Sequence, residues 1–213
     1  ALEVNGSFDD CQRLVKKAFG DDDLRKKLFL TSANSINIAR WLPQQFYYFL
    51  AYKQWKQKEQ APVICVPSGN FGNICAGVLA HRSGLPVSHF IAACNVNDTI
   101  PRSLTSEKYE PLTARPTLSN AMDVADPSNF IRIMEIFGQT LPSLRERFSS
   151  VSVSDTDTLD TIKQVSEKYH YTLDPHGAVG YFALEQYLRA HPGQKGYFLE
   201  TAHPVKFPDA IVQ

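Results

Sequence analysis

A short stretch rich in glycine and asparagine, Ser68-Gly69-Asn70-Phe71-Gly72-Asn73, carries the residue types best suited to holding an anion. It follows an apolar run that ends at Val66 and precedes a segment of helical character that begins near Ile74. Backbone N–H groups at a helix N-terminus converge on one point, and the helix dipole there favours negative charge. Glycines let the backbone approach a bound phosphate closely. Because ligands of open α/β sheets bind at the carboxyl ends of strands, the stretch predicts a phosphate site.

A plain turn between a strand and a helix would use the same residue types, so spacing alone leaves both interpretations open. The stretch is not a P-loop, because no Gly-Lys-Ser/Thr sequence follows it. It also lacks the Gly-x-Gly-x-x-Gly spacing that is typical of dinucleotide binding. These differences argue against a nucleotide enzyme.

A second polar cluster precedes an aromatic-rich segment of helical character. Its hydroxyl and amide groups suit a phosphate or a carboxylate, with an arginine as charge partner. Helix capping and turn formation explain the same residues about as well. The candidate substrate-binding residues in this cluster are Ser32, Asn34, Ser35, Asn37 and Arg40.

Further polar residues follow a predicted strand that ends near Ala93, where they would help to shape the same pocket. These residues are Asn95, Asn97, Asp98 and Arg102. His176 and His203 lie near the ends of other predicted elements. We expect both to be structural histidines with satisfied hydrogen bonds rather than proton carriers.

Apolar runs predict the strands that would position these residues. Strands are predicted over Pro62–Val66, His89–Ala93, Val151–Val153 and Gly196–Leu199, with a shorter candidate at Phe29–Thr31. Helical spacing predicts helices over residues 11–20, 36–55 and 74–82, and from Asp155 and Asp174 onward. Alternation of strands and helices of these lengths predicts an α/β fold with an open, mostly parallel twisted sheet flanked by helices.

Three details of these elements are less regular. Pro43 suggests a break or a second start in the helix of residues 36–55. The segment 99–129, with several prolines, is predicted to be irregular. Asp155 is expected to cap its helix, and Tyr169 is expected on the inner face of that helix together with Ile162 and Val165.

Composition is ordinary for a soluble globular protein of 213 residues, with 43% hydrophobic and 21% charged residues. Lys+Arg and Asp+Glu both number 22, so the balanced charge argues against a nucleic-acid partner. No run reaches the roughly 18 to 20 apolar residues of a membrane span. Cys11, Cys65, Cys75 and Cys94 form no CxxC pair, which argues against a zinc site or other metal site and against disulfides. Reduced thiols favour a cytoplasmic protein.

The sequence at both ends of the chain suggests truncation. Ala1–Val4 resembles the end of a strand that has nothing before it, and the sequence stops at Gln213 shortly after a strand. We therefore expect a truncated chain, although a small domain with frayed ends would explain the same features.

The loop Val66–Asn73 resembles the loop that holds the phosphate of pyridoxal 5'-phosphate (PLP) in threonine synthases. Five further stretches resemble the bacterial and fungal type of that family in the same order along the chain. They are Phe8–Gln12, Thr31–Arg40, Phe90–Arg102, Thr117–Val124 and Thr201–Phe207. The resemblance implies the two-lobed PLP fold of the tryptophan synthase β type. It also implies a PLP-dependent lyase of threonine biosynthesis, which converts O-phospho-L-homoserine and water to L-threonine and phosphate.

By resemblance, the cofactor-binding residues are Gly69, Asn70, Phe71, Gly72, Asn73 and Thr201. The first five would hold the phosphate, and the Thr201 hydroxyl would meet the pyridine nitrogen. A neutral hydroxyl fits there because it does not demand a fully protonated ring nitrogen.

The family's Schiff-base lysine lies in a Phe-Lys-Asp context in the N-terminal part, and no lysine here has that context. Lys206 matches the family's C-terminal motif instead and is expected at the pocket rim or on the surface. Residues 1–213 would therefore be the cofactor-phosphate-binding part of a threonine synthase that lacks its N-terminal lobe. This chain has no catalytic residue of its own and is expected to be inactive alone. The alternatives are a non-catalytic PLP- or phosphate-binding regulatory protein and a phosphate-binding enzyme unrelated to PLP.

Overall fold

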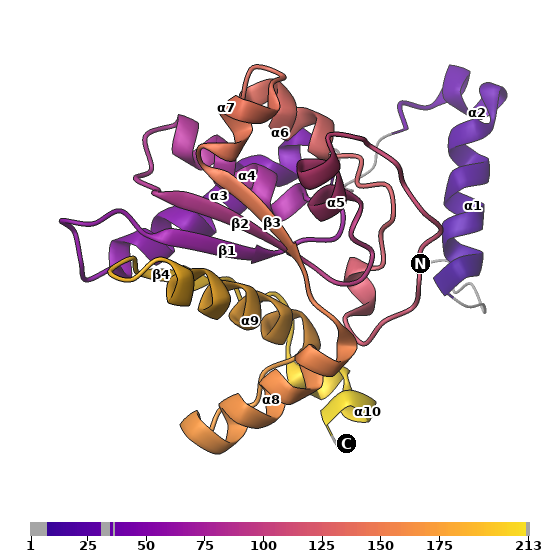
Figure 1. The fold of residues 1–213 in the computed structure, drawn as a ribbon. Coiled ribbons are helices and arrows are strands. Elements are labelled where there is room, and N and C mark those ends of the chain that lie inside the picture. The colour runs from indigo at the N-terminus through magenta and orange to yellow at the C-terminus, as the bar shows by residue number, and fades with distance from the viewer. Residues whose placement is uncertain (1–7, 31–34, 36, 212–213) are drawn as a thin grey trace. The chain divides into compact units, whose positions relative to one another are not determined.

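The computed structural model describes residues 8–30, 35 and 37–211, which divide into two compact units, residues 1–34 and 35–213 (Figure 1). The units are described separately. The strand expected at Ala1–Val4 and the substrate candidates Ser32 and Asn34 lie outside the described residues.

The first unit contains α1 (Phe8–Gly20) and α2 (Asp22–Lys27). The predicted helix that ends at Gly20 is confirmed, whereas α2 was missed. Asp21 starts α2, because its carboxylate accepts hydrogen bonds from the N–H groups of Asp23 and Leu24 at 2.9 and 3.0 Å. The strand candidate is wrong for the described residues 29 and 30, which pair with no strand; the Phe29 side chain is 98% exposed.

The second unit is built on a parallel sheet, which among the described residues has four strands in the order β3-β2-β1-β4. The strands are β1 (Val63–Pro67), β2 (His89–Cys94), β3 (Phe148–Ser152) and β4 (Gly196–Phe198). Cys65 in β1 aligns with Ile91 in β2 and Phe198 in β4. The predicted fold class, an open parallel α/β sheet flanked by helices, is confirmed.

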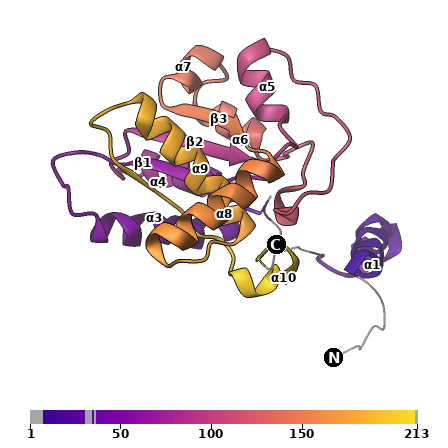
Figure 2. The ribbon, with the colours of Figure 1, turned by 60° about the horizontal axis from the view of Figure 1, so that its bottom comes forward.

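Side chains on opposite faces of the sheet enter two hydrophobic clusters, as the period of two residues in a strand requires. Ile64 and Phe90 pack toward α3 (Ile38–Gln54) and α4 (Gly72–Arg82), and Val63 and Ile91 pack toward α9. The helices α5 (Thr99–Ser106), α6 (Phe130–Ile136) and α7 (Leu141–Arg145) contribute to the α3–α4 side. On the other side, α8 (Asp155–Tyr169) lies beside α9 (Pro175–Ala190), as Figure 2 shows. Three short helices complete the unit: η1 (Asn120–Met122), η2 (Pro204–Lys206) and α10 (Pro208–Ile211).

Several details differ from the sequence-based expectation. The helix α3 continues through Pro43, because buried Trp41 and Tyr48 anchor the turns on either side of the proline. Residues 99–106 form the helix α5 rather than an irregular segment, since Ile100 and Leu104 are buried one turn apart. At α8 the N-cap is Ser154, whose hydroxyl accepts from the Asp157 N–H at 3.1 Å, so Asp155 is already helical. Tyr169 is 53% exposed and does not belong to the inner face of α8.

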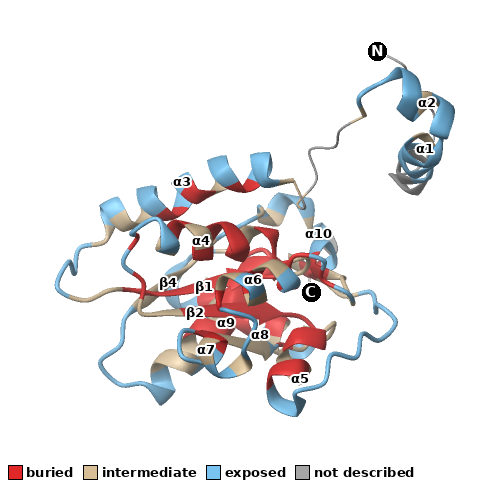
Figure 3. Ribbon diagram, turned by 90° about the horizontal axis from the view of Figure 1, so that it is seen from above, coloured by how far each residue is buried: buried red, intermediate tan, exposed pale blue. Residues whose placement is uncertain are grey.

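The outer face of α3 is exposed, as the pale blue in Figure 3 shows, and it carries large apolar side chains. Ile38, Leu42, Phe46 and Leu50 follow helical spacing and are each at least 50% exposed. The opposite face of α3 packs on α4 through Tyr48. Exposed apolar patches of this kind are typical of interaction surfaces.

Three of the cysteines, Cys65, Cys75 and Cys94, are buried free thiols, as predicted. Burial raises the pKa of the Cys75 and Cys94 thiols to about 12, so these thiols are protonated near neutral pH. Within the described residues, no helix combines the length and the apolarity needed to cross a membrane.

Candidate functional site

The strand order reverses at β1. The chain continues from β1 to β2 and β3 on one side of β1, and β4 returns to its other side. Such a switch point leaves a crevice outside the carboxyl ends of the neighbouring strands, where ligands of open α/β sheets bind. The loop of residues 68–71 follows β1, and Glu200 and Thr201 follow β4 closely. The topology therefore brings the two predicted parts of the site together.

The loop ends in a residue of left-handed conformation. Phe71, the N-cap of α4, has φ 61° and ψ 9°, and among the described residues no side chain caps this helix. The left-handed residue of this loop is therefore a phenylalanine and neither of the asparagines. The Phe71 ring is only 3% exposed and packs edge-on against Phe130, with centroids 5.9 Å apart, so burial offsets the backbone strain. The first N–H groups of α4 are left without a side-chain cap, which is the geometry that binds anions.

Both loop glycines allow close approach of another part of the protein. A Cβ on Gly69 would lie 2.6 Å from the Met122 Cα and 3.1 Å from the Ala121 carbonyl oxygen. A Cβ on Gly72 would lie 2.9 Å from the Ser35 Cβ. The sequence suggested that these glycines leave space for a ligand; the structure adds that they let the loop pack on its neighbours.

The two loop asparagines hold the loop in place with their side chains. Asn70 Nδ2 donates to Ser35 Oγ at 2.7 Å, and Asn70 Oδ1 accepts from the N–H and hydroxyl of Ser128 at 2.8 and 3.0 Å. The Tyr48 hydroxyl group lies 2.8 Å from Asn73 O and 3.0 Å from Asn73 Oδ1, and it can donate its hydrogen bond to either oxygen. The Asn70 amide group is therefore occupied by protein partners on both sides.

A cavity of about 780 Å³ joins the loop to the end of β4. Ser35, Arg40 and Lys206 also line it, and Lys206 is exposed. Asn37 instead caps α3, where its Oδ1 accepts from the Ala39 N–H at 2.9 Å. The sequence-predicted residues that meet at this cavity are Ser35, Arg40, Gly69, Asn70, Phe71, Gly72, Asn73 and Thr201.

Sequence reasoning missed other lining residues. Gln44 and Tyr47 line the cavity and follow Arg40 by one and two helical turns of α3, so helical spacing could have found them. Glu200 and Met122 also line it. No local pattern marks these two, because tertiary packing brings them to the cavity.

The sequence matches the family model described as pyridoxal-phosphate dependent enzyme over residues 1–198. The chain belongs to this family. It is 48% identical to threonine synthase of Serratia marcescens over an alignment of 211 residues. The alignment covers 99% of this chain and 48% of that protein. The crystal structure of threonine synthase from Escherichia coli superposes with a TM-score of 0.86 at 47% identity, covering 98% of this chain and 48% of the other. The crystal structure of PLP-bound threonine synthase from Brucella melitensis superposes with a TM-score of 0.85 at 37% sequence identity. The match covers 97% of this chain and 49% of the other.

These comparisons confirm the resemblance to threonine synthases. The chain spans about half the length of the relatives it matches. Its likeness to them extends over nearly its whole length, so the cavity between β1 and β4 lies inside the matched region.

In this member of the pyridoxal-phosphate family, His176 has a structural role, as predicted. Its Nδ1 lies 2.8 Å from Asp174 Oδ1, and its Nε2 accepts the N–H of Ala121 at 3.3 Å. This pattern is consistent with the hydrogen on Nδ1, and both ring nitrogens have protein partners although His176 lines the cavity. His203 is structural as well, since its Nδ1 accepts the N–H of Val205 at 3.2 Å and caps η2.

Near the cavity, the carboxyl groups of Glu200 and Asp174 shift each other's pKa. Glu200 is an exposed residue whose carboxyl group is partly enclosed; this enclosure, then the hydrogen bond and charge of Asp174, raise the pKa of Glu200 to about 8. Burial alone would raise the pKa of Asp174, but hydrogen bonds, above all from His176, lower it overall. Of the two groups, Glu200 therefore holds a proton near neutral pH.

The polar residues after β2 do not line this cavity themselves. Asn97, Asp98 and Arg102 line a separate cavity of about 320 Å³, with Arg102 Nε 2.8 Å from Asp98 Oδ1. The Asn95 side chain donates to Asp123 Oδ1 at 2.9 Å and is buried. Asn97 also donates to Asp123 Oδ1, at 3.1 Å, so both asparagines hold residues on either side of Ala121 and Met122, which line the main cavity.

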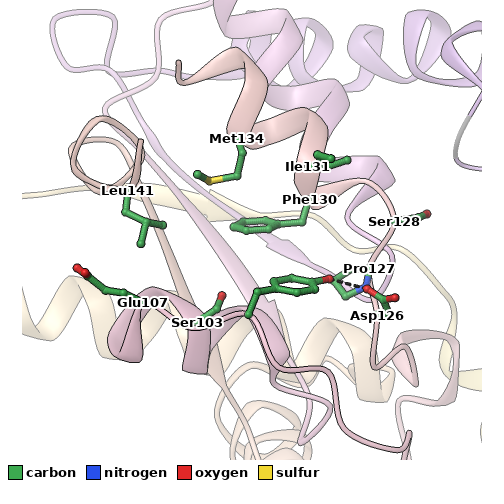
Figure 4. A pocket seen from close by; sticks show the side chains of 10 residues that line it. Ser103, Glu107, Asp126, Pro127, Ser128, Phe130, Ile131, Met134 and Leu141 are labelled. Carbon is green, nitrogen blue, oxygen red and sulfur yellow. Dashed lines mark hydrogen bonds between the residues drawn. The ribbon is translucent and has the colours of Figure 1, made fainter. Parts of the chain in front are cut away.

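A third, apolar cavity of about 510 Å³ lies beside Phe130 and Ser128, the residues that contact the loop of residues 68–71. Figure 4 shows Phe130 and Met134 of α6 facing Ser103 and Glu107 across it. Ser128, which binds Asn70, also lines this cavity. Phe130 and Ser128 therefore serve both the wall of this cavity and the conformation of the loop.

Proposed function

We propose that this chain is the cofactor-phosphate-binding part of a threonine synthase, which converts O-phospho-L-homoserine and water to L-threonine and phosphate. The observation that carries the proposal is the single cavity that joins the uncapped N-terminus of α4 to Thr201. The 48% identity to the threonine synthase of Serratia marcescens supports it. Because that relative is about twice as long, the activity is proposed for a longer protein that contains this chain.

The residues around the cavity suit PLP. A volume of about 780 Å³ lies in the range of small-molecule and cofactor sites. The backbone N–H groups of the loop Gly69–Asn73 would hold the phosphate, since the side chains of Asn70 and Asn73 already bind protein partners. The Thr201 hydroxyl would meet the pyridine nitrogen. When bound, PLP supplies an electron sink for carbanions next to the substrate amino group.

Substrate recognition is assigned to the α3 side of the cavity. Arg40 suits the phosphate or carboxylate of O-phospho-L-homoserine, because guanidinium groups bind such anions in bidentate fashion. Ser35 accepts from Asn70 and retains its own hydroxyl proton for donation. Ser32, Asn34 and Asn37 complete the proposed set, although Asn37 also caps α3.

Proton transfer is assigned to a lysine outside this chain. His176 uses both ring nitrogens in structural hydrogen bonds. Lys206 lies in the Pro-Val-Lys-Phe motif at the rim of the cavity rather than in a Phe-Lys-Asp context. The isolated chain is therefore expected to bind PLP without fixing it and to form no threonine.

Borohydride treatment of the chain mixed with PLP tests this proposal. We expect reversible binding, seen as a rise in Tm with PLP concentration, and no stoichiometric fixation at any lysine by mass spectrometry. Fixation at one lysine together with threonine formation would show that the chain is catalytically complete. A gene that encodes no Phe-Lys-Asp context upstream in the same reading frame would favour the non-catalytic regulatory homologue.

Asn70→Ala should weaken PLP binding about tenfold and destabilise the chain by about 1 kcal/mol, because bonds to Ser35 and Ser128 are lost. Asn70→Asp is the matched variant: it keeps the acceptor for Ser128 and places a negative charge beside the phosphate. It should therefore be the more stable of the two and the weaker in PLP binding. Titration of PLP fluorescence and urea unfolding measure both quantities. Unchanged PLP binding in both variants would refute the assignment of the loop.

A further inference from the structure

Asp174 has one carboxylate oxygen that needs a partner. This residue is fully buried and caps α9: its Oδ1 accepts from the backbone N–H of His176 at 2.9 Å and meets His176 Nδ1 at 2.8 Å. Its Oδ2 is buried and has no hydrogen-bond partner among the described residues. A buried carboxylate oxygen without a donor is costly, so this site requires a proton donor.

Glu200 lies where it can supply that donor. Its carboxyl group rests on Gly177 in the first turn of α9, so that a Cβ on Gly177 would overlap both carboxyl oxygens. The backbone N–H of Leu199 donates to Cys65 O at 3.0 Å, which anchors Glu200 to the end of β1. Glycine at position 177 thus makes room for a glutamate carboxyl group beside Asp174.

We propose that Glu200 and Asp174 form a proton-sharing carboxyl pair, in which protonated Glu200 donates to Asp174 Oδ2. The pair holds the segment after β4 against α9 and thereby positions Thr201, the next residue, at the cavity. The role at Thr201 rests on the proposed function, whereas the pair itself does not.

Electrostatics agree with this geometry. Two carboxylates in contact repel each other, so one of them keeps its proton at neutral pH. The hydrogen bonds from His176 favour the ionised form of Asp174, which leaves the proton on Glu200. The charge of Glu200, followed by burial and the charge of Asp174, also raises the pKa of the Tyr171 hydroxyl group. The cations that line the same cavity are Lys206 on η2 and Arg40 on α3.

The pair makes the site sensitive to alkaline pH. The pKa of Glu200 is about 8 in the folded chain, above the ordinary value of 4.5, so the folded state binds more protons than the unfolded state between these values. The contribution of Glu200 to stability is therefore fully present below about pH 4.5 and falls as pH rises to about 8. Above that pH two carboxylates repel each other, and Thr201 is held less firmly.

Glu200→Gln provides the test, because glutamine keeps a donor for Asp174 and does not titrate. Between pH 7 and 9 we expect the Kd of the wild-type chain for PLP to rise about tenfold more than that of the variant. Since both proteins meet the same PLP, the ionisation of PLP itself cancels in this comparison. The Tm of the wild type should also fall by about 2–4 °C more than that of the variant over this range.

The carboxyl ¹³C resonance of Glu200 reports the pair without PLP. We expect it to titrate well above the ordinary range in the wild type and to return toward that range in Asp174→Asn. An ordinary titration in the wild type, or equal pH dependence of Tm in the wild type and Glu200→Gln, would overturn the pair. A raised titration in a chain that binds no PLP at any pH would uphold the pair, but it would refute its role at Thr201 together with the proposed function.

Discussion

Replacing Gly69 with alanine should weaken PLP binding about 10- to 100-fold and destabilise the chain by about 1–3 kcal/mol. The added Cβ would lie 2.6 Å from the Met122 Cα and 3.1 Å from the Ala121 carbonyl oxygen, both of which are backbone atoms. Backbone cannot rotate away as a flexible side chain can, so the loop must shift. Such a shift would displace the N–H groups before α4 that are proposed to hold the phosphate. PLP titration and urea unfolding of the variant measure the two effects.

Gly20→Ala is the matched control for this substitution. No described atom lies within 4 Å of a Cβ placed on Gly20, which ends α1 in the other unit. We expect its Kd for PLP to equal that of the wild type. If Gly69→Ala also bound PLP normally and kept its stability, the close packing of the loop on residues 121 and 122 would be disproved.

Replacing Gly77 with alanine should destabilise the chain by about 2–4 kcal/mol, the sum of overpacking and a lost hydrogen bond. The added Cβ would lie 2.5 Å from Cζ and 2.9 Å from Oη of Tyr48, whose side chain is fully buried. Moving this ring would withdraw the hydroxyl group from Asn73 in the first turn of α4. The Kd for PLP should therefore rise as well, and thermal or urea unfolding gives the change in stability.

A double-mutant cycle with Tyr48→Phe sharpens the argument, because phenylalanine keeps the ring and removes the hydroxyl group. If Gly77→Ala already breaks the bond to Asn73, the two losses overlap and the double variant should be less destabilised than their sum. Strict additivity would mean that the ring does not move and that the first turn of α4 is independent of this contact.

The parts of the fold that were predicted correctly depend on local patterns. The apolar runs of β1 and β2 and the Asp174-Pro175 start of α9 carry their signals within a few residues. The helix α5 was missed because it has only eight residues and contains Pro101. Phe29 was misassigned because an apolar triplet says nothing about whether a partner strand exists.

The residues of the candidate site likewise divide into those that a local sequence pattern reveals and those that depend on tertiary packing. The loop after β1 could be found from its glycines, and Thr201 from its resemblance to a family motif. The proposed pairing of Glu200 with Asp174 could not be found, because it requires Gly177 to face Glu200, which lies 23 residues further along the sequence. The left-handed Phe71 was also hidden, since only the surrounding core makes that conformation tolerable for a phenylalanine.

The left-handed Phe71 has a consequence for how this protein can change over generations. A residue that shapes the proposed anion site has its side chain in the hydrophobic interior, against Phe130. Substitutions that alter the volume of the interior there are therefore not functionally silent, even though they touch no ligand. Selection on ligand affinity would act on Phe130 as it acts on the loop, and drift in this part of the interior would be slower than its distance from the cavity suggests.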